Sequence, residues 1–258
     1  DGLSMNAVLK SILETETVSD GIRDLPLRHP DFPDLPVHLD HDEGMFLQRI
    51  ISDVRPAVSL EIGCAYGVST LYICEAIASL GIRARHIVMD PFQSTQWQGI
   101  GLRNARMAGF DSIIEFHENR SELVLPKLLE RGEAIDFALI DGWHTFDQVM
   151  VEFYYLNRLL RVGGVLAFDD ADRRSVNRVI RHALTYSCYR VYGSEGRPPA
   201  RSSLAGRARR MAARLPKAAA ILRPDVIRRD WELGIFGSCV AIQKIAEEHR
   251  SSGWDKPF

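Results

Sequence analysis

The sequence predicts an α/β protein with a doubly wound, mostly parallel sheet of seven strands, as in Rossmann-like folds. Short apolar runs alternate with longer segments of helical periodicity, which is the pattern of strands joined by crossover helices. A glycine turn follows the first apolar run of this alternation, and acidic residues follow several others. Because ligands of open parallel sheets bind outside the carboxyl ends of the strands, we expect these residues to face one crevice.

The composition is that of an ordinary globular chain. A net charge of -2 and 46% hydrophobic residues exclude a disordered protein and disfavour general nucleic-acid binding. There is no apolar run of membrane-spanning length and no signal-peptide pattern over residues 1–20, so we expect a cytoplasmic location and no membrane partner. The four cysteines lack Cys-x-x-Cys spacing and are expected to be reduced thiols.

Residues 1–55 are expected to form an N-terminal helical extension, and residues 56–258 the main domain. Apolar residues at helical spacing predict a first helix over 4–18, either a lid or the contact of a homodimer. Four prolines then make 25–36 an extended connector. A second helix, with an aspartate at its start as the cap, is expected to lead directly into the sheet.

Strands and helices alternate through the main domain. Apolar runs predict the strands, and amphipathic segments ending near glycines predict the helices. The expected strands cover 58–62, 86–89, 113–117, 135–140, 165–168, 189–192 and 233–242, and the expected helices cover 71–80, 97–109, 122–131, 146–160 and 173–186.

The turn after the first strand of the sheet has an unusual spacing of glycines. It reads Glu61-Ile62-Gly63-Cys64-Ala65-Tyr66-Gly67, whereas a dinucleotide site wants Gly-x-Gly-x-x-Gly. We expect bulky Tyr66 to leave little room for a phosphate and Glu61 to favour a cationic ligand, such as S-adenosylmethionine (SAM). Asp90 follows the next strand, where a carboxylate takes ribose hydroxyls. The alternative is an ordinary strand-to-helix turn.

Three further carboxylates follow later strands of the sheet. Asp141 ends the fourth strand, and Asp169 and Asp170 end the fifth. Three carboxylates at one point repel unless a cation lies between them, and oxygen ligands favour Mg²⁺, Mn²⁺ or Ca²⁺. A cation that held a substrate hydroxyl would lower its pKa, and neutral His144 could take the proton. The alternative is that the aspartates cap helices and that His144 is bonded to backbone.

A basic insertion, residues 195–230, lies between the last two expected strands. Residues 197–230 contain ten Lys or Arg against two Asp, a local net charge of +8, which leaves about -10 for the rest. Three interpretations are a solvated surface with a helix over 204–215, a nucleic-acid or membrane contact, and a flap over the substrate. Topology favours the flap over a distant binding patch, because a loop leaving the C-terminal end of a parallel sixth strand starts on the crevice side of the sheet.

The order of these motifs resembles the class I SAM-dependent methyltransferases, and most closely the metal-dependent O-methyltransferases typified by caffeoyl-CoA and catechol O-methyltransferases. The resemblance covers roughly residues 38–192. It includes Asp42-Glu43-Gly44-Met45-Phe46-Leu47 ahead of the first strand of the sheet and Ser121-Glu122-Leu123-Val124-Leu125-Pro126 on the adenine side. The cofactor-binding residues that the resemblance implies are Glu61, Gly63, Ala65, Tyr66, Gly67, Ser69, Asp90, Ser121, Asp141 and Trp143.

The same resemblance implies a metal centre and a base. Asp141, Asp169 and Asp170 resemble the family's metal ligands, with Asp170 where asparagine is common. His144 stands where the family has a lysine base, and Trp143 where an aromatic flanks adenine. Asp-Asp also occurs in related sugar and macrolide O-methyltransferases, but these often carry an acidic base at the position of Trp143.

The resemblance therefore implies methyl transfer from SAM to a hydroxyl of a small molecule, assisted by a divalent cation and with His144 as the base. If the basic insertion closes on the crevice, the acceptor would be acidic. Alternatives are metal-independent transfer to N, O or C, a nicotinamide oxidoreductase, and a nucleic-acid-binding module that uses residues 197–230.

Overall fold

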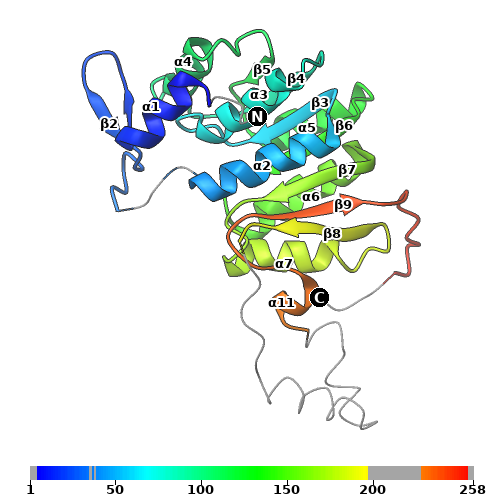
Figure 1. The fold of residues 1–258 in the computed structure, drawn as a ribbon. Coiled ribbons are helices and arrows are strands. Elements are labelled where there is room, and N and C mark those ends of the chain that lie inside the picture. The colour runs from blue at the N-terminus through cyan, green and yellow to red at the C-terminus, as the bar shows by residue number, and fades with distance from the viewer. Residues whose placement is uncertain (1–4, 35–36, 38, 197–227, 255–258) are drawn as a thin grey trace.

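The computed structural model describes residues 5–34, 37, 39–196 and 228–254, and it confirms the predicted fold class (Figure 1). The strands of the central sheet are β3 (Val58–Ile62), β4 (Arg85–Met89), β5 (Ile114–His117), β6 (Ile135–Ile140), β7 (Leu160–Phe168), β8 (Tyr189–Ser194) and β9 (Val240–Lys244). They form a 7-stranded sheet in the order β5-β4-β3-β6-β7-β9-β8. Only β9 runs against its neighbours in this sheet, so β8 points the same way as β7.

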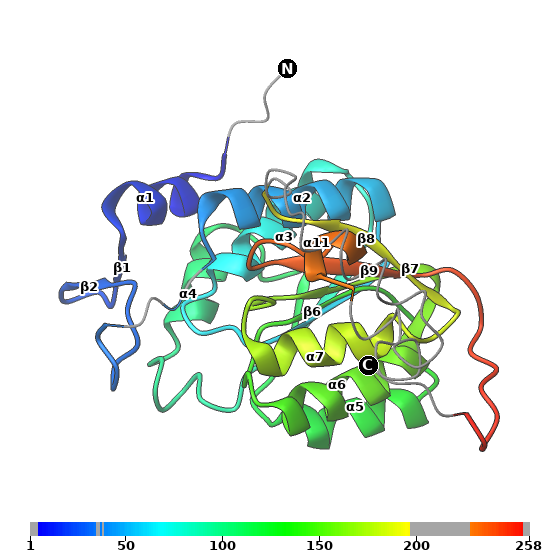
Figure 2. The ribbon, with the colours of Figure 1, turned by 90° about the horizontal axis from the view of Figure 1, so that it is seen from below.

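Helices cover both faces of the sheet (Figure 2). One face carries α2 (His41–Val54) and α3 (Val68–Ser79), and the other carries α5 (Ser121–Glu130), α6 (Phe146–Leu159) and α7 (Arg174–Ala183). A further helix, α4 (Ile100–Met107), packs beside α3. Two apolar layers result, one under α2 and α3 and one under α5, α6 and α7. Since α2 shares its layer with sheet strands, the predicted boundary at residue 55 does not divide this core.

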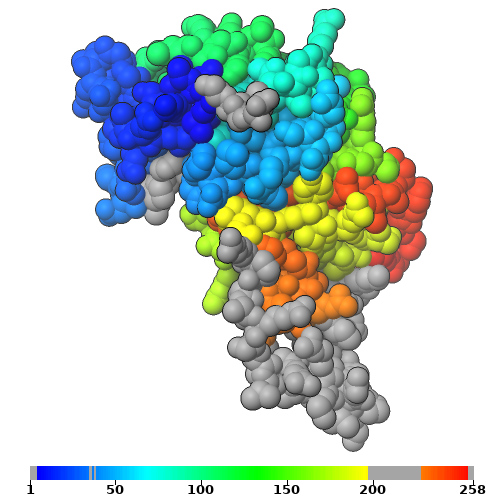
Figure 3. All heavy atoms as spheres, viewed as in Figure 1, coloured from blue at the N-terminus to red at the C-terminus, as the bar shows by residue number. Residues whose placement is uncertain are grey.

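The N-terminal segment differs from its prediction. Helix α1 (Ala7–Thr15) ends before residue 18, and a hairpin of β1 (Thr17–Ser19) and β2 (Asp24–Pro26) follows it. Asp20 forms the turn, because its Oδ1 accepts the amides of Ile22 at 2.8 Å and Arg23 at 2.7 Å. The expected connector therefore begins with a strand. In the space-filling view this segment, in dark blue, forms a lobe beside α2 (Figure 3).

The C-terminal end also needs one correction. The last strand begins at Val240, and not at Leu233 as predicted. Leu233 instead ends the short helix α11 (Asp230–Leu233), which Gly234 closes in a left-handed conformation at φ 83°. Most of the basic insertion, including the helix expected over 204–215, lies outside the described residues.

Helix α2 packs very closely on α3 at one glycine. Asp40 caps α2, as the sequence predicted: its Oδ1 accepts the Glu43 amide at 2.9 Å, and Glu43 Oε2 accepts the Asp40 amide at 2.7 Å. One turn on, a Cβ built at Gly44 would lie 2.3 Å from the ring of Tyr72, which is fully buried. Only a residue without a side chain fits there.

We expect Gly44→Ala to lower the free energy of unfolding by about 1–3 kcal/mol, because the added methyl group overlaps a ring that has no space to move. Helix propensity alone predicts the opposite sign, a gain of about 1 kcal/mol. Urea unfolding would measure the change. Gly253→Ala, at a position with open space around it, serves as the control; a stabilised Gly44→Ala protein would contradict the close packing.

Candidate active site

Three carboxylates follow neighbouring strands at one edge of the sheet. The backbone amide of Asp141 donates to Ile62 at 2.9 Å, and that of Asp169 donates to Ile140 at 3.0 Å. Asp90 follows β4 on the other side of β3 and donates in the same way to the end of β5. Each acid is thus held by the last carbonyl of an adjacent strand, which confirms that these residues share one edge.

The loop after β3 requires two glycines. Gly63 has φ +94°, and a Cβ on it would lie 2.1 Å from the carbonyl oxygen of Asp141. Gly67 has φ +81°, and a Cβ there would lie 2.9 Å from the carbonyl oxygen of Gly101. Both positions combine a left-handed backbone with close contact to the backbone of another segment, the loop after β6 for Gly63 and α4 for Gly67. These two predicted cofactor residues therefore set the path of the loop.

Asp90 fastens this loop to the end of β4. Its Oδ2 accepts the amides of Cys64 at 3.2 Å and Ala65 at 2.9 Å, and its Oδ1 accepts the amide of Phe92 at 2.8 Å. Gln93 Nε2 adds a bond to the carbonyl of Ala65 at 2.6 Å. Asp90 is nearly buried and already accepts three amides, so its contact with a ribose stays a prediction.

Glu61 supports the same loop from below. Its carboxylate accepts the hydroxyls of Ser69 and, at 2.6 Å, Thr70. His86 Nε2 lies 3.1 Å from Glu61 Oε2, and His86 Nδ1 lies 2.9 Å from the Ser59 hydroxyl. All five side chains are buried. Glu61 and Ser69 thus hold each other in this structure, and their contacts with a ligand stay predictions.

Tyr66 does not occupy the loop in the way that we expected. Its ring is buried against Trp97, with the centroids 5.2 Å apart, and its hydroxyl donates to the carbonyl of Arg28 at 3.3 Å. The side chain therefore points toward the N-terminal hairpin and α4. We expected the Tyr66 ring to leave little room for a phosphate. That reason was wrong, because the ring is buried in the apolar cluster around Trp97 and does not fill the loop.

Two aromatic side chains follow the strands that end at the aspartates. Trp143 is 65% exposed, although it is a large apolar residue. Its ring centroid lies 6.4 Å from that of Phe92, at an interplanar angle of 54°. Phe92 was not among the predicted cofactor-binding residues. The sequence signal that could have identified it is its position two residues after Asp90. Ser121, by contrast, is buried and bonds to side chains of α6.

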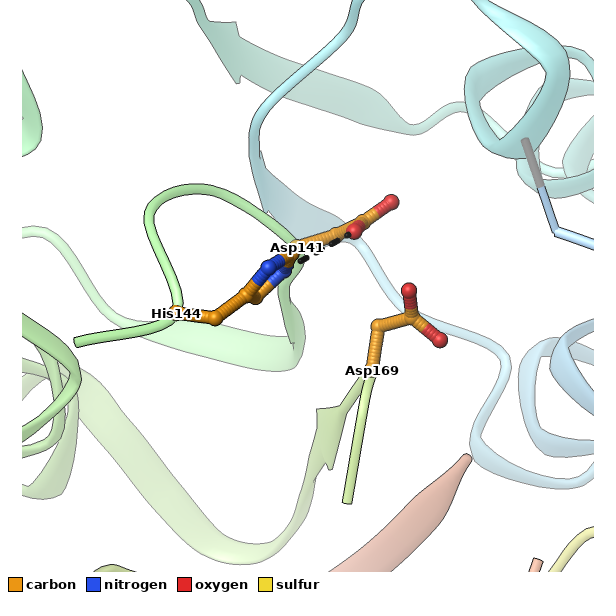
Figure 4. A group of neighbouring side chains, drawn as sticks. All are labelled: Asp141, His144 and Asp169. Carbon is orange, nitrogen blue, oxygen red and sulfur yellow. Dashed lines mark ion pairs between the residues drawn. The ribbon is translucent and has the colours of Figure 1, made fainter. Parts of the chain in front are cut away.

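Asp141, His144 and Asp169 point toward one another (Figure 4). Each offers one ligand atom, and these atoms lie within 4.8 Å of one another. His144 Nε2 lies 3.7 Å from Asp141 Oδ1. The hydroxyl of Ser175 on α7 donates to the His144 carbonyl at 2.5 Å and fixes that loop. Two carboxylates and an imidazole are a donor set that suits a divalent cation.

Asp170 is not part of this group, although we predicted it as a metal ligand. Its Oδ2 lies 2.9 Å from His144 Nδ1 and 2.9 Å from Arg173 Nε. Its backbone is left-handed, with φ 52°. In this structure, therefore, the histidine replaces the third carboxylate, and Asp170 acts on the histidine.

The charges of the group are strongly perturbed. Burial raises the pKa of Asp169 well above its usual range, and neighbouring Asp141 adds to the effect. Burial also raises the pKa of Asp141. Burial alone would lower the pKa of His144, but bonds to Asp141 and Asp170 outweigh it and raise the pKa to about 9. His144 is thus an imidazolium at neutral pH and serves as the counter-ion of the two aspartates.

The four cysteines are free and buried, as predicted. Within the described part of the chain, no helix has both the length and the apolar character needed to span a membrane.

A model of the methyltransferase domain family matches residues 60–171. The flavonoid 3′,5′-methyltransferase of Vitis vinifera is 26% identical over 177 residues, which are 65% of this chain and 72% of that protein. Caffeoyl-CoA O-methyltransferase 2 of Populus trichocarpa is 28% identical over 178 residues, which are 65% of this chain and 68% of that protein.

Solved structures share the fold. The S-adenosylhomocysteine-bound methyltransferase PaMTH1 of Podospora anserina has a TM-score of 0.60 at 14% identity, over 95% of this chain and 89% of that one. The O-methyltransferase TomG of Streptomyces achromogenes, in complex with SAM, has a TM-score of 0.58 at 19% identity, over 73% of this chain and 82% of that one.

The contact between Gly63 and Asp141 can be tested by substitution. We expect Gly63→Ala to lower the free energy of unfolding by about 2–5 kcal/mol, because left-handed strain and a clash with backbone add. Gly81→Ala is a matched control: Gly81 is also left-handed, at φ +61°, but has open space around it. Equal losses in the two variants, measured by urea unfolding, would show that the close contact contributes nothing.

Proposed function

We propose that this chain, which is a class I SAM-dependent methyltransferase of the O-methyltransferase type, methylates a hydroxyl of a small molecule with a divalent cation held by Asp141, His144 and Asp169. The observation that carries the proposal is the convergence of these three side chains at the sheet edge, next to the loop after β3.

The cofactor would lie along the loop from Gly63 to Gly67 and the start of α3. Two features support this position. The loop is fixed by Asp90 and by contact with Asp141 before any ligand arrives, so little conformational entropy would be lost on binding. Exposed Trp143 and nearby Phe92 offer faces on which an adenine ring could stack.

The chemistry of the donor set supports a cation. Burial raises the pKa of both Asp141 and Asp169, and Asp141 raises the pKa of Asp169 further, so the pair binds a proton more readily than an isolated carboxylate does. A divalent cation would relieve this repulsion and release the proton. A bound cation supplies a Lewis acid that lowers the pKa of a coordinated hydroxyl. The acceptor oxygen would then face the sulfonium methyl, and Asp170 would orient His144 through the contact with Nδ1.

His144 has two candidate roles, cation ligand or base. An imidazolium with a pKa of about 9 is neutral in only about one molecule in a hundred at pH 7, which is a poor starting point for a base. As a ligand it would bind the cation through the nitrogen lone pair and release its proton to solvent. We therefore propose the ligand role and treat the predicted base role as the outcome that would replace it.

Finer features of the partner stay proposals. The proposal of an acidic acceptor rests only on the charge of the basic insertion. The described surroundings of Asp169 are instead acidic, because the negative charge of Glu43 helps to raise the pKa of Asp169. A homodimer through α1 and a cytoplasmic location likewise rest on the sequence alone.

The proposal is tested by methyl transfer from SAM to a panel of catechols, hydroxylated acyl-CoA esters and sugars, with and without Mg²⁺. Turnover that EDTA abolishes and Mg²⁺ restores would support it. Turnover that survives EDTA would select a metal-independent methyltransferase. Thermal stabilisation by NAD but not by SAM would select an oxidoreductase.

Asp169→Asn removes one charge from the donor set. We expect the dissociation constant of Mn²⁺ to rise more than tenfold, about 1.4 kcal/mol, and Mg²⁺-dependent turnover to fall at least as much. Titration calorimetry measures the first quantity. Asp172→Asn, at an exposed position of the same loop, is the control; equal Mn²⁺ affinity in the two variants would remove Asp169 from the site.

The role of His144 predicts a pH dependence. Below its pKa of about 9, the imidazolium must lose its proton before it can coordinate, so Mn²⁺ binding should tighten up to tenfold per pH unit from pH 7 to 9. His144→Ala should weaken Mn²⁺ binding and remove the part of its pH dependence that comes from His144, while turnover at saturating Mn²⁺ changes little. If His144 is the base, the variant should instead lose about 10²–10⁴ in kcat with Mn²⁺ affinity intact.

A further inference from the structure

Glu152 is a buried acid that the mechanism above does not use. It lies on α6 with 1% of its surface exposed. Its Oε1 accepts the hydroxyl of Ser121 at 2.7 Å and the amide of Gln148 at 3.2 Å. Its Oε2 has no hydrogen-bond partner among the described residues. Gly142 lies above it: a Cβ there would be 3.8 Å from Oε1.

This arrangement is costly for the fold. Burial raises the pKa of Glu152 to about 7, against the lowering effect of the bonds from Ser121 and Gln148. A buried carboxylate with one oxygen unpartnered destabilises a folded protein relative to a neutral side chain of similar shape. Glu152 therefore does not serve stability, and residues of that kind are found where function requires them.

The bond from Ser121 connects Glu152 to the cofactor side of the crevice. Ser121 is the first residue of α5, and this helix begins without a side-chain cap. The Leu123 amide already donates to the Arg120 carbonyl at 3.0 Å, so the amides of Ser121 and Glu122 are the ones that a ligand could bind. Gln148 Nε2 also donates to Ser121 at 2.9 Å and to Glu122 at 3.2 Å. The Ser121 hydroxyl thus donates its one proton to Glu152 and accepts from Gln148, so two side chains of α6 fix its orientation.

We propose that Glu152 is a positioning residue for the cofactor: by accepting the Ser121 hydroxyl it holds the first turn of α5 where the amides of that turn would meet the adenine ring. The inference rests on the cofactor site proposed above. It adds a residue on α6 that touches neither the cofactor nor the reacting atoms and acts through Ser121 alone.

The first experiment separates positioning from stability. In Glu152→Gln we expect the dissociation constant of S-adenosylhomocysteine to rise about tenfold, because an amide oxygen is a weaker acceptor than a carboxylate. The melting temperature without ligand should stay equal or rise, because a buried charge is removed. Glu130→Gln, at the exposed end of α5, is the matched control. An unchanged dissociation constant, or a lowered melting temperature, would overturn the proposal.

A double-mutant cycle tests the route through Ser121. Ser121→Ala alone should weaken the binding of S-adenosylhomocysteine about as much as Glu152→Gln does. The double variant should bind no more weakly than either single variant, within twofold, because both changes act on the same hydrogen bond. Additive losses would overturn the proposal. If the wild-type chain itself fails to bind S-adenosylhomocysteine in calorimetry, the cofactor assignment fails instead.

A pH profile gives a readout that a structural residue would not move. The groups that face Glu152 are Glu122 from α5, Gln148 from α6 and His144 from the loop after β6. The pKa of Glu152, about 7, lies within the pH range of the measurement. S-Adenosylhomocysteine binding measured in EDTA should therefore weaken in the wild type from pH 8 to 6, as Glu152 is protonated, and stay flat in Glu152→Gln. The same slope in both proteins would contradict the role of Glu152.

Discussion

The site depends on the contact between the loop after β3 and the loop after β6. Gly63 can approach the carbonyl of Asp141 only because it has no side chain and a left-handed backbone. That contact fixes where Asp141 leaves the sheet, and Asp141 in turn fixes where His144 and a cation can lie. Asp90 completes the arrangement by bonding the amides of the same loop. Cofactor side and acceptor side are therefore parts of one rigid unit.

Much of this could be predicted from the sequence, because it follows from backbone periodicity. Asp90, Asp141 and Asp169 each follow an apolar run, and strands of a parallel sheet end at one edge. The direction of a side chain within a loop does not follow from periodicity. The ring of Tyr66 was therefore misplaced, and the turn of Asp170 toward Arg173 was missed.

Short elements were lost for a related reason. The strands of the N-terminal hairpin have three residues each, too few to show an alternating pattern, and prolines nearby indicate a connector. The predicted strand at Leu233 failed because Leu233 ends α11 and Gly234, inside the apolar run, has the left-handed backbone that closes that helix. Glu152 belongs to no sequence motif that we recognised. Its importance is visible only from its burial and from an oxygen without a partner.

The reversed direction of β9 has an effect beyond sheet order. β8 ends and β9 begins at the edge that carries the aspartates, and the amide of Glu195 donates to the carbonyl of Cys239 at 2.8 Å. The chain thus leaves the sheet at Glu195 and rejoins it at Cys239 through one hydrogen-bonded stem. Changes in the length of the segment between these two residues would leave the stem and the pairing of β9 with β7 intact.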